Sequence, residues 1–201
     1  MRIDRLARTA TDMFLEQGYA SLTVDQLIAR AGGSRRNVYD HFGGKDGLLI
    51  EAVKRLCVEI AAPMEALPLP DGDPVAGLRS FAHRILEIVL HPRAVAMHRL
   101  MVAEGERFPE LAQAIYRAGQ ERAYKVLTAY LHRHRRMLGL HDTGPSPEIL
   151  AEQFVDLIAP HAQLRALIGL ESTAEDRTEI VENALKLFLR GIGQLERHTD
   201  V

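Results

Sequence analysis

The sequence predicts an all-α protein in which a small N-terminal domain of three helices precedes a larger helical domain. Apolar residues recur at the i, i+3, i+4, i+7 spacing of a helix along most of the chain, and aromatic residues make up only 5% of it. A stretch rich in proline and glycine, from Pro63 to Pro74, separates the two parts and is expected to be a linker. We therefore expect about nine helices, divided into domain 1–50 and domain 51–201.

The N-terminal domain is expected to begin with a helix from about Ile3 to Gln17 and to continue with a shorter one from Val24 to Ala31. Thr23 and Gln26 have the spacing of a capping box, in which each side chain satisfies a backbone N–H at the start of the helix. Gly32-Gly33 follows, and glycine adopts positive φ at little cost, so we expect a tight turn there.

A third short helix follows the turn, with Ser34 as its cap and Arg35, Arg36 and Asn37 in its first turn. Two short helices joined in this way have the layout of a helix-turn-helix, whose second helix enters the DNA major groove with its N-terminal residues on base edges. A guanidinium can contact guanine through two hydrogen bonds, and Asn37 could read adenine or merely cap the helix. Two arginines on an isolated helix would be interpreted as solvated, but inside this motif we favour base contacts.

Tyr39, His41, Lys45 and the helix start at Thr23 are expected to hold phosphates. A helix N-terminus suits this role because it offers free N–H groups and the positive end of its dipole. Tyr39 could instead belong partly to the core. The whole chain has a net charge of −2, so DNA affinity has to come from the local placement of positive charge. The predicted DNA-binding residues are Thr23, Ser34, Arg35, Arg36, Asn37, Tyr39, His41 and Lys45.

Residues 6–49 also resemble the N-terminal domain of the TetR family of transcriptional regulators. The matching positions are Ala10, Phe14, Gly18-Tyr19, Thr23-Val24-Asp25, Ile28-Ala29, Ala31-Gly32, Ser34, Tyr39, His41-Phe42, Lys45 and Leu48-Leu49. Gly33, Gly44 and Gly47 depart from the residues usual in that family. The resemblance implies a helix-turn-helix regulator that binds DNA as a dimer.

The larger domain is expected to be helical to its end. Asp73-Pro74 is a typical helix start, a short helix should run from Arg93 to about Glu104, and Pro109 should open a long helix that ends in the basic run RHRR. The stretch from Met101 to Ala112 resembles the ligand domain of AefR-like TetR regulators, and Phe188–Gly191 resembles their last helix.

The helix expected from Glu148 to Ile168 carries two apolar stripes. One stripe is a seven-residue repeat seam that consists of Leu150, Phe154, Leu157, His161, Leu164 and Ile168. The other consists of the smaller residues Ala151, Val155, Ile158 and Ala162, and the final helix also carries two stripes. A surface helix needs one apolar stripe, so we favour a second stripe that faces a partner, although a helix central to its own domain would look the same. In the family that the chain resembles, the last two helices form a homodimer interface. The residues assigned to that interface are Val155, Ile158, Ala162, Ile180 and Leu187.

A ligand pocket is expected in the larger domain, because such pockets are mostly apolar with a few placed polar groups. A lone histidine on an apolar face is usually a hydrogen-bonded core residue, and no histidine here has the spacing of a metal site. We expect neither a metal nor a cofactor. The assigned pocket residues are Met97, His98, Met101, Tyr116, Phe154 and His161.

Three classes of function remain. The favoured one is a homodimeric repressor that binds a palindromic double-stranded DNA operator and is released by a small, largely apolar ligand. A constitutive DNA-binding or architectural protein, whose second domain only dimerises, is the alternative. An enzyme is disfavoured because the sequence has no phosphate-binding glycine loop, nucleophile motif or metal set. With a single cysteine, Cys57, and no signal peptide or membrane span, a cytoplasmic protein without a membrane partner is expected.

Overall fold

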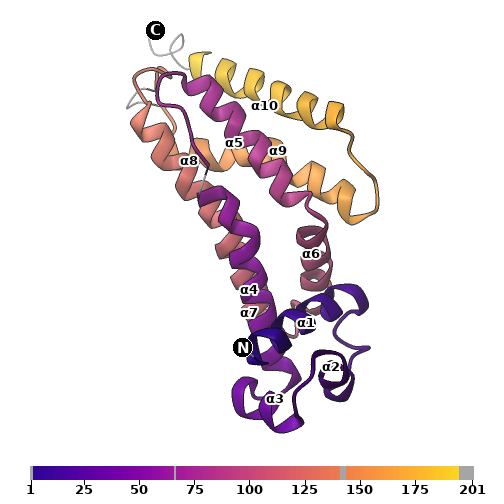
Figure 1. The fold of residues 1–201 in the computed structure, drawn as a ribbon. Coiled ribbons are helices and arrows are strands. Elements are labelled where there is room, and N and C mark those ends of the chain that lie inside the picture. The colour runs from indigo at the N-terminus through magenta and orange to yellow at the C-terminus, as the bar shows by residue number, and fades with distance from the viewer. Residues whose placement is uncertain (1, 66, 141–143, 195–201) are drawn as a thin grey trace. The chain divides into compact units, whose positions relative to one another are not determined.

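The computed structural model describes residues 2–65, 67–140 and 144–194, and these residues form helices without any strand (Figure 1). α7, the π-turn η1 and α8 follow one another without a break, so the described residues form nine continuous helices, the number expected. The elements are α1 (Arg2–Gln17), α2 (Val24–Ala31), α3 (Arg35–Phe42), α4 (Lys45–Glu65), α5 (Pro74–Val89), α6 (Pro92–Glu104), α7 (Pro109–Tyr116), η1 (Arg117–Glu121), α8 (Arg122–Arg133), α9 (Pro147–Leu167) and α10 (Ala174–Gln194).

The chain divides into two compact units. The first unit consists of residues 1–61 and 92–119, and the second unit consists of residues 62–91 and 120–201. The first unit is discontinuous because α6 packs against α1 and the apolar residues of α7 join the same core. The expected boundary at residue 50 between a DNA-binding and an effector domain stays a prediction. By packing, residues 51–61 and 92–119 belong to the same compact unit as residues 1–50.

Local sequence signals account for the helix-turn-helix. The Thr23 hydroxyl accepts a hydrogen bond from the Gln26 backbone N–H at 3.3 Å, and the Gln26 side chain accepts one from the Thr23 N–H at 2.8 Å, which confirms the capping box. Ser34 caps α3 by accepting from the backbone N–H of Asn37 at 3.2 Å. Gly33 has a φ of +122°, where a side chain would be strained, so this departure from the family pattern follows from the turn itself.

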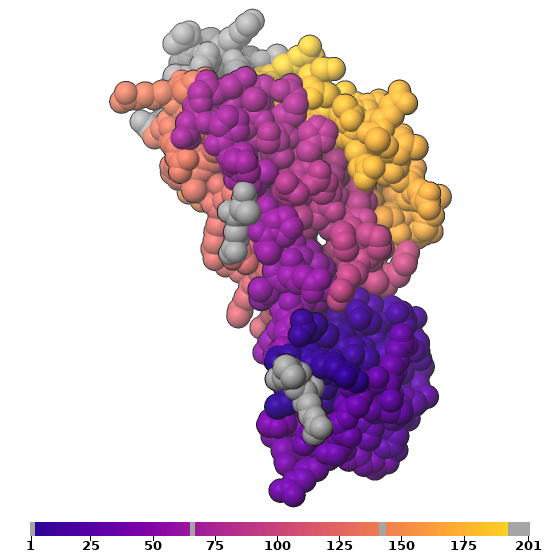
Figure 2. Space-filling view, in the orientation of Figure 1, coloured from indigo at the N-terminus to yellow at the C-terminus, as the bar shows by residue number. Residues whose placement is uncertain are grey.

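The core of the first unit joins the helix-turn-helix to helices from beyond the linker. Phe14, Leu27 and Leu48 are fully buried in it. Phe108, which precedes α7, is also buried, and its ring meets that of Tyr19 edge-on at 5.1 Å between centroids. In the space-filling view the atoms of residues 2–50, drawn indigo to violet, form one closely packed lobe (Figure 2).

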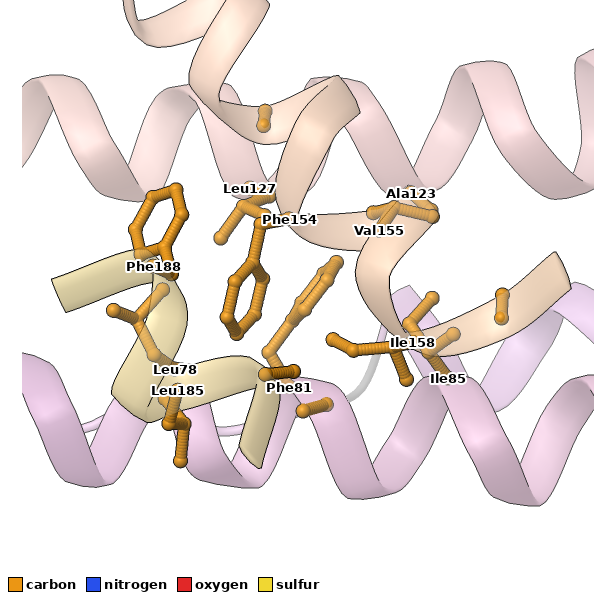
Figure 3. Packing of buried hydrophobic residues seen from close by; sticks show 14 of the residues in the cluster. Leu78, Phe81, Ile85, Ala123, Leu127, Phe154, Val155, Ile158, Leu185 and Phe188 are labelled. Carbon is orange, nitrogen blue, oxygen red and sulfur yellow. The ribbon is translucent and has the colours of Figure 1, made fainter. Parts of the chain in front are cut away.

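The second unit is built around α9, which packs against α5, α8 and α10. Phe81, Phe154 and Phe188 meet between these helices, and the rings of Phe154 and Phe188 lie 4.8 Å apart (Figure 3). Asp73 caps α5 by accepting hydrogen bonds from two backbone N–H groups, as its position before a proline predicts. α9 is therefore central to its own unit, the alternative that the sequence left open.

Two expectations about the helices are wrong: the place of Pro63 in the linker and the place of Tyr116 on an apolar stripe. Pro63 lies inside α4 rather than in the linker, because α4 continues far enough to bury Met64 in the core of the second unit. The long helix expected from Pro109 runs without a break through α7, η1 and α8, and the π-turn adds a residue to one of its turns. Tyr116, the last residue of α7 and expected on the apolar stripe, is half-exposed, whereas Leu111 and Ile115 of α7 are buried.

Candidate functional site

The first turn of α3 presents the two arginines expected to read DNA, and both are exposed. Arg35 is paired with Asp25 of α2: Nε donates to Oδ1 at 2.6 Å, and Nη2 donates to Oδ2. This ion pair lowers the pKa of the Asp25 carboxyl below its usual range. Arg36 makes a looser pair with Asp40 one turn along α3, at 3.2 Å from Nε.

Four more predicted DNA-binding residues, Thr23, Ser34, Tyr39 and His41, are exposed at the start of α2 or along α3. Asn37 is half-buried. Tyr39 is 57% exposed, so the alternative that it belongs to the core is disfavoured. Together with the two arginines, these side chains lie on the two helices of the motif, as base and phosphate contacts require.

Lys45, the first residue of α4, has partners within the protein. Its Nζ donates to the backbone carbonyls of Tyr19 at 3.0 Å and Leu22 at 2.6 Å, and it lies 3.9 Å from the centre of the Tyr19 ring. The ammonium therefore stabilises the turn between α1 and α2. A phosphate would have to compete with these partners, so phosphate binding by Lys45 stays a prediction.

A cluster of polar contacts around the buried Tyr19 lies beside Lys45, and sequence reasoning did not find it. The Tyr19 hydroxyl donates to Asp46, and burial together with this bond raises the pKa of Tyr19 to about 12. The guanidinium of Arg107 lies 4.9 Å from the centre of the Tyr19 ring and 3.9 Å from Asp46. The turn between α6 and α7 thus contacts the start of α4, within the first unit.

A second ionic contact ties α6 to the same unit. Arg93, in the first turn of α6, reaches Asp12 of α1 at 3.1 Å and Glu59 of α4 at 3.5 Å. No sequence pattern signals this contact, because the three residues lie far apart in the chain.

The six residues assigned to a ligand pocket fall into both units. Met97, His98, Met101 and Tyr116 belong to the first unit, and Phe154 and His161 belong to the second. Met97 and Phe154 are buried in the core of their respective units, whereas His161 is exposed on α9. His98 is half-buried, and the backbone carbonyl of Ala94, one turn earlier in α6, lies 2.9 Å from its Nδ1. A common pocket for the six residues stays a prediction.

The face of α9 assigned to a partner needs correction. Val155, Ile158 and Ala162 are buried in the core of the second unit within a single chain (Figure 3 labels the first two), so they cannot meet a second copy. Ile180 is half-buried against the same core, and Leu187, at 62% exposure, is the most exposed of the five assigned residues.

Exposed apolar residues lie instead further along the seven-residue seam. Leu150 and Phe154, at its start, are buried in the core. Leu157, Leu164 and Ile168, which follow, are 43%, 58% and 66% exposed. These three residues and Leu187 of α10 are called the α9–α10 apolar face below.

The described residues contain neither a metal-binding cluster nor a membrane-spanning helix. No three His, Cys, Asp or Glu side chains in residues 2–65, 67–140 and 144–194 gather into a set that could hold a metal ion. Over the same part of the chain, no helix has the length and apolar character that crossing a membrane requires.

Comparisons with known proteins agree with the geometry. Residues 76–192 match the family model described as AefR-like transcriptional repressor, C-terminal domain, and residues 6–52 match the model of bacterial regulatory proteins, tetR family. The HTH-type transcriptional regulator TcmR of Streptomyces glaucescens is 26% identical over 121 residues, which are 59% of this chain and 54% of TcmR. The chain thus spans about half the length of this curated relative.

Solved structures extend the likeness over nearly the whole chain. The flavonoid-responsive regulator FrrA is 30% identical, with a TM-score of 0.77 over 94% of this chain and 96% of that one. A TetR family transcriptional regulator from Pseudomonas syringae pv. tomato is 19% identical, with a TM-score of 0.70 over 93% of this chain and 94% of that one, a likeness that concerns the fold.

Proposed function

Because the chain belongs to the TetR family of transcriptional regulators, whose members are not enzymes, we propose that it is a repressor that binds a palindromic DNA operator as a homodimer and leaves it when a small ligand binds. The observation that carries this proposal is the first turn of α3. Two exposed arginines stand there on a helix that is capped by Ser34 and follows α2 after a glycine turn. That is the arrangement in which a recognition helix reads base edges.

Homodimer formation is supported by the α9–α10 apolar face. Leucine and isoleucine side chains exposed on neighbouring helices lose contact with water when a second copy covers them, which favours association. A two-fold axis between two copies would present two recognition helices to two half-sites related by the same symmetry. A palindromic operator follows from that symmetry.

Release by a ligand is supported by the second domain. Its match to an AefR-like repressor domain and the likeness to a flavonoid-responsive regulator both point to a small molecule. We propose that the molecule is largely apolar with one or two polar groups, because the assigned pocket residues combine methionine and aromatic side chains with histidine. Such a ligand lowers DNA affinity only if it binds the conformation that cannot fit the operator more tightly.

Selection of binding sites from random double-stranded DNA by the full chain tests the DNA-binding part. We expect a two-fold symmetric site whose half-sites are about one helical turn apart. Arg35→Ala or Arg36→Ala should reduce discrimination at one base pair of each half-site by about 5- to 150-fold. Recovery of no symmetric site from the selection would refute the repressor proposal.

Release of the selected DNA tests the ligand part. A flavonoid is the first probe, because FrrA is described as flavonoid-responsive. Mass spectrometry of small molecules that co-purify with the protein provides further probes. Dissociation of the complex at a ligand concentration that leaves the helical circular dichroism unchanged supports the proposal, whereas DNA binding unaffected by every probe favours a constitutive DNA-binding protein.

A further inference from the structure

We propose that Asp25 determines specificity at one base pair by orienting the guanidinium of Arg35 for guanine. The inference rests on the proposed DNA binding and concerns a residue outside the recognition helix. Asp25 lies in the first turn of α2, and Arg35 is the first residue of α3. The ion pair therefore connects the two helices of the motif across the glycine turn.

The geometry of the pair leaves the base-reading side of the guanidinium free. Arginine has five N–H donors in a rigid planar fork. The Asp25 carboxylate accepts from Nε and from one N–H of Nη2, which occupies the side edge of the fork. The end of the fork, formed by Nη1 and the second N–H of Nη2, keeps two donors side by side. Two such donors are what the O6 and N7 acceptors of guanine require.

Asp25 and Arg35 both lie at helix starts that are held in place by caps and by the core. α2 begins in the capping box of Thr23 and is held in the core by the fully buried Leu27, and Ser34 caps α3 directly before Arg35. The ion pair therefore restrains a long, flexible side chain against two anchored helix ends. Its side chains are 66% and 56% exposed, so the pair adds little to folding stability. We infer that its consequence is the reduced freedom of the Arg35 side chain before DNA arrives.

Arg36 offers a contrast within the same turn. It meets Asp40 through a single contact at 3.2 Å, both residues lie on α3, and its side chain is 88% exposed. This contact does not connect two elements and leaves the guanidinium free to rotate. Asp25→Asn and Asp40→Asn therefore remove the same charge from the same motif, but only the first removes an orienting pair.

A competing account gives Asp25 the opposite effect, because a carboxylate bound to an arginine competes with DNA for it. The two accounts differ in measurable ways. An orienting carboxylate makes binding more specific, so that its loss weakens discrimination between base pairs. A competing carboxylate makes binding weaker at the operator, so that its loss tightens operator binding and keeps discrimination intact.

The experiment compares the wild-type full chain with Asp25→Asn, Asp40→Asn and Arg35→Ala on the selected site and on a set of sites with one base pair changed. Titrations at several salt concentrations separate base readout from phosphate contacts. We expect Asp25→Asn to reduce discrimination at the base pair that Arg35→Ala also affects, by about fivefold or more. Asp40→Asn should leave that discrimination unchanged, while both Asn variants tighten non-specific binding alike because each removes one negative charge.

A double variant and a longer carboxylate complete the test. Adding Asp25→Asn to Arg35→Ala should cause no further loss of discrimination, because the carboxylate acts through the arginine. Asp25→Glu keeps the charge at the helix start, so its lower discrimination would reflect displaced geometry and not a damaged helix. If Asp25→Asn keeps the wild-type base preference, or tightens operator binding without changing it, the inference is wrong. If the wild type selects no symmetric site, the proposed function itself fails.

Discussion

The α9–α10 apolar face leads to a prediction in which two neighbouring positions on one helix behave in opposite ways. Leu164 is 58% exposed, whereas Ala162, two residues earlier, is fully buried in the core of the second unit. Leu164→Glu places a charge on the free surface of the single chain and in the proposed dimer interface. We expect it to yield a folded monomer, while Ala162→Glu, which puts an unpaired charge into the core, should disrupt the fold itself.

The size of the effect on dimerisation follows from the exposed surface. Burying a whole leucine side chain is worth about 1.5–3 kcal/mol, so covering the exposed 58% of Leu164 is worth about 0.9–1.7 kcal/mol. A two-fold interface contains the residue twice, which gives about 1.7–3.5 kcal/mol for the dimer. The dissociation constant of the dimer should then rise about 20- to 400-fold, and the cost of desolvating two carboxylates adds to this.

Equilibrium ultracentrifugation over a range of protein concentrations measures the dissociation constant, and circular dichroism measures the helical content. Operator affinity should fall together with dimerisation, because one half-site alone supplies about half of the contacts. Leu170→Glu, an exposed position outside the face, is the control. If Leu164→Glu stays as dimeric as the wild type, the α9–α10 apolar face is not the interface and the argument from exposure is refuted.

Three further predictions concern the cores and the charges. Phe108→Ala should lower the free energy of unfolding by about 3–5 kcal/mol in denaturant titrations, because it empties a buried site, whereas Val102→Ala at a 73% exposed position should change it little. The Glu148 carboxyl accepts a hydrogen bond from His132, which lowers the pKa of Glu148 from 4.5 to about 2. The ionised carboxylate therefore contributes to stability above pH 4.5, and this contribution is lost as the pH falls towards 2. The difference in thermal stability between the wild type and Glu148→Gln should shrink over that range. Burial raises the pKa of the Cys57 thiol to about 11, and a maleimide should label it at neutral pH only after unfolding; rapid labelling of the folded protein would contradict its burial.

Local signals in the sequence predict the helix-turn-helix well. The capping box at Thr23, the cap at Ser34 and the glycine turn each depend on residues within three positions of one another, so the chain carries the whole signal. The same is true of the start of α5 at Asp73. Exposed arginines on α3 follow from the same reasoning, because a short helix with one apolar face has to expose the other.

Contacts between distant residues are what the sequence could not predict. The ion pair of Arg35 with Asp25 and the position of Lys45 over the Tyr19 ring depend on how helices pack in three dimensions. Two apolar stripes on α9 indicated two buried faces, but periodicity does not say which neighbour covers each of them. Leu164 and Ala162 illustrate this limit of periodicity, because the small Ala162 is buried in the core and the larger Leu164 is exposed to solvent.

The discontinuous first unit limits how the DNA-reading helices could be exchanged between related regulators. A chimera joined at a single point after α4 would carry the DNA-reading helices of one parent and the 92–119 segment of the other. Phe108 and Leu111 would then come from a protein that never packed against this Tyr19. A working graft has to transfer two segments together, and natural recombination at one crossover meets the same constraint. The segment between α5 and α8 should therefore diverge in step with the DNA-reading helices, although it lies far from them in the sequence.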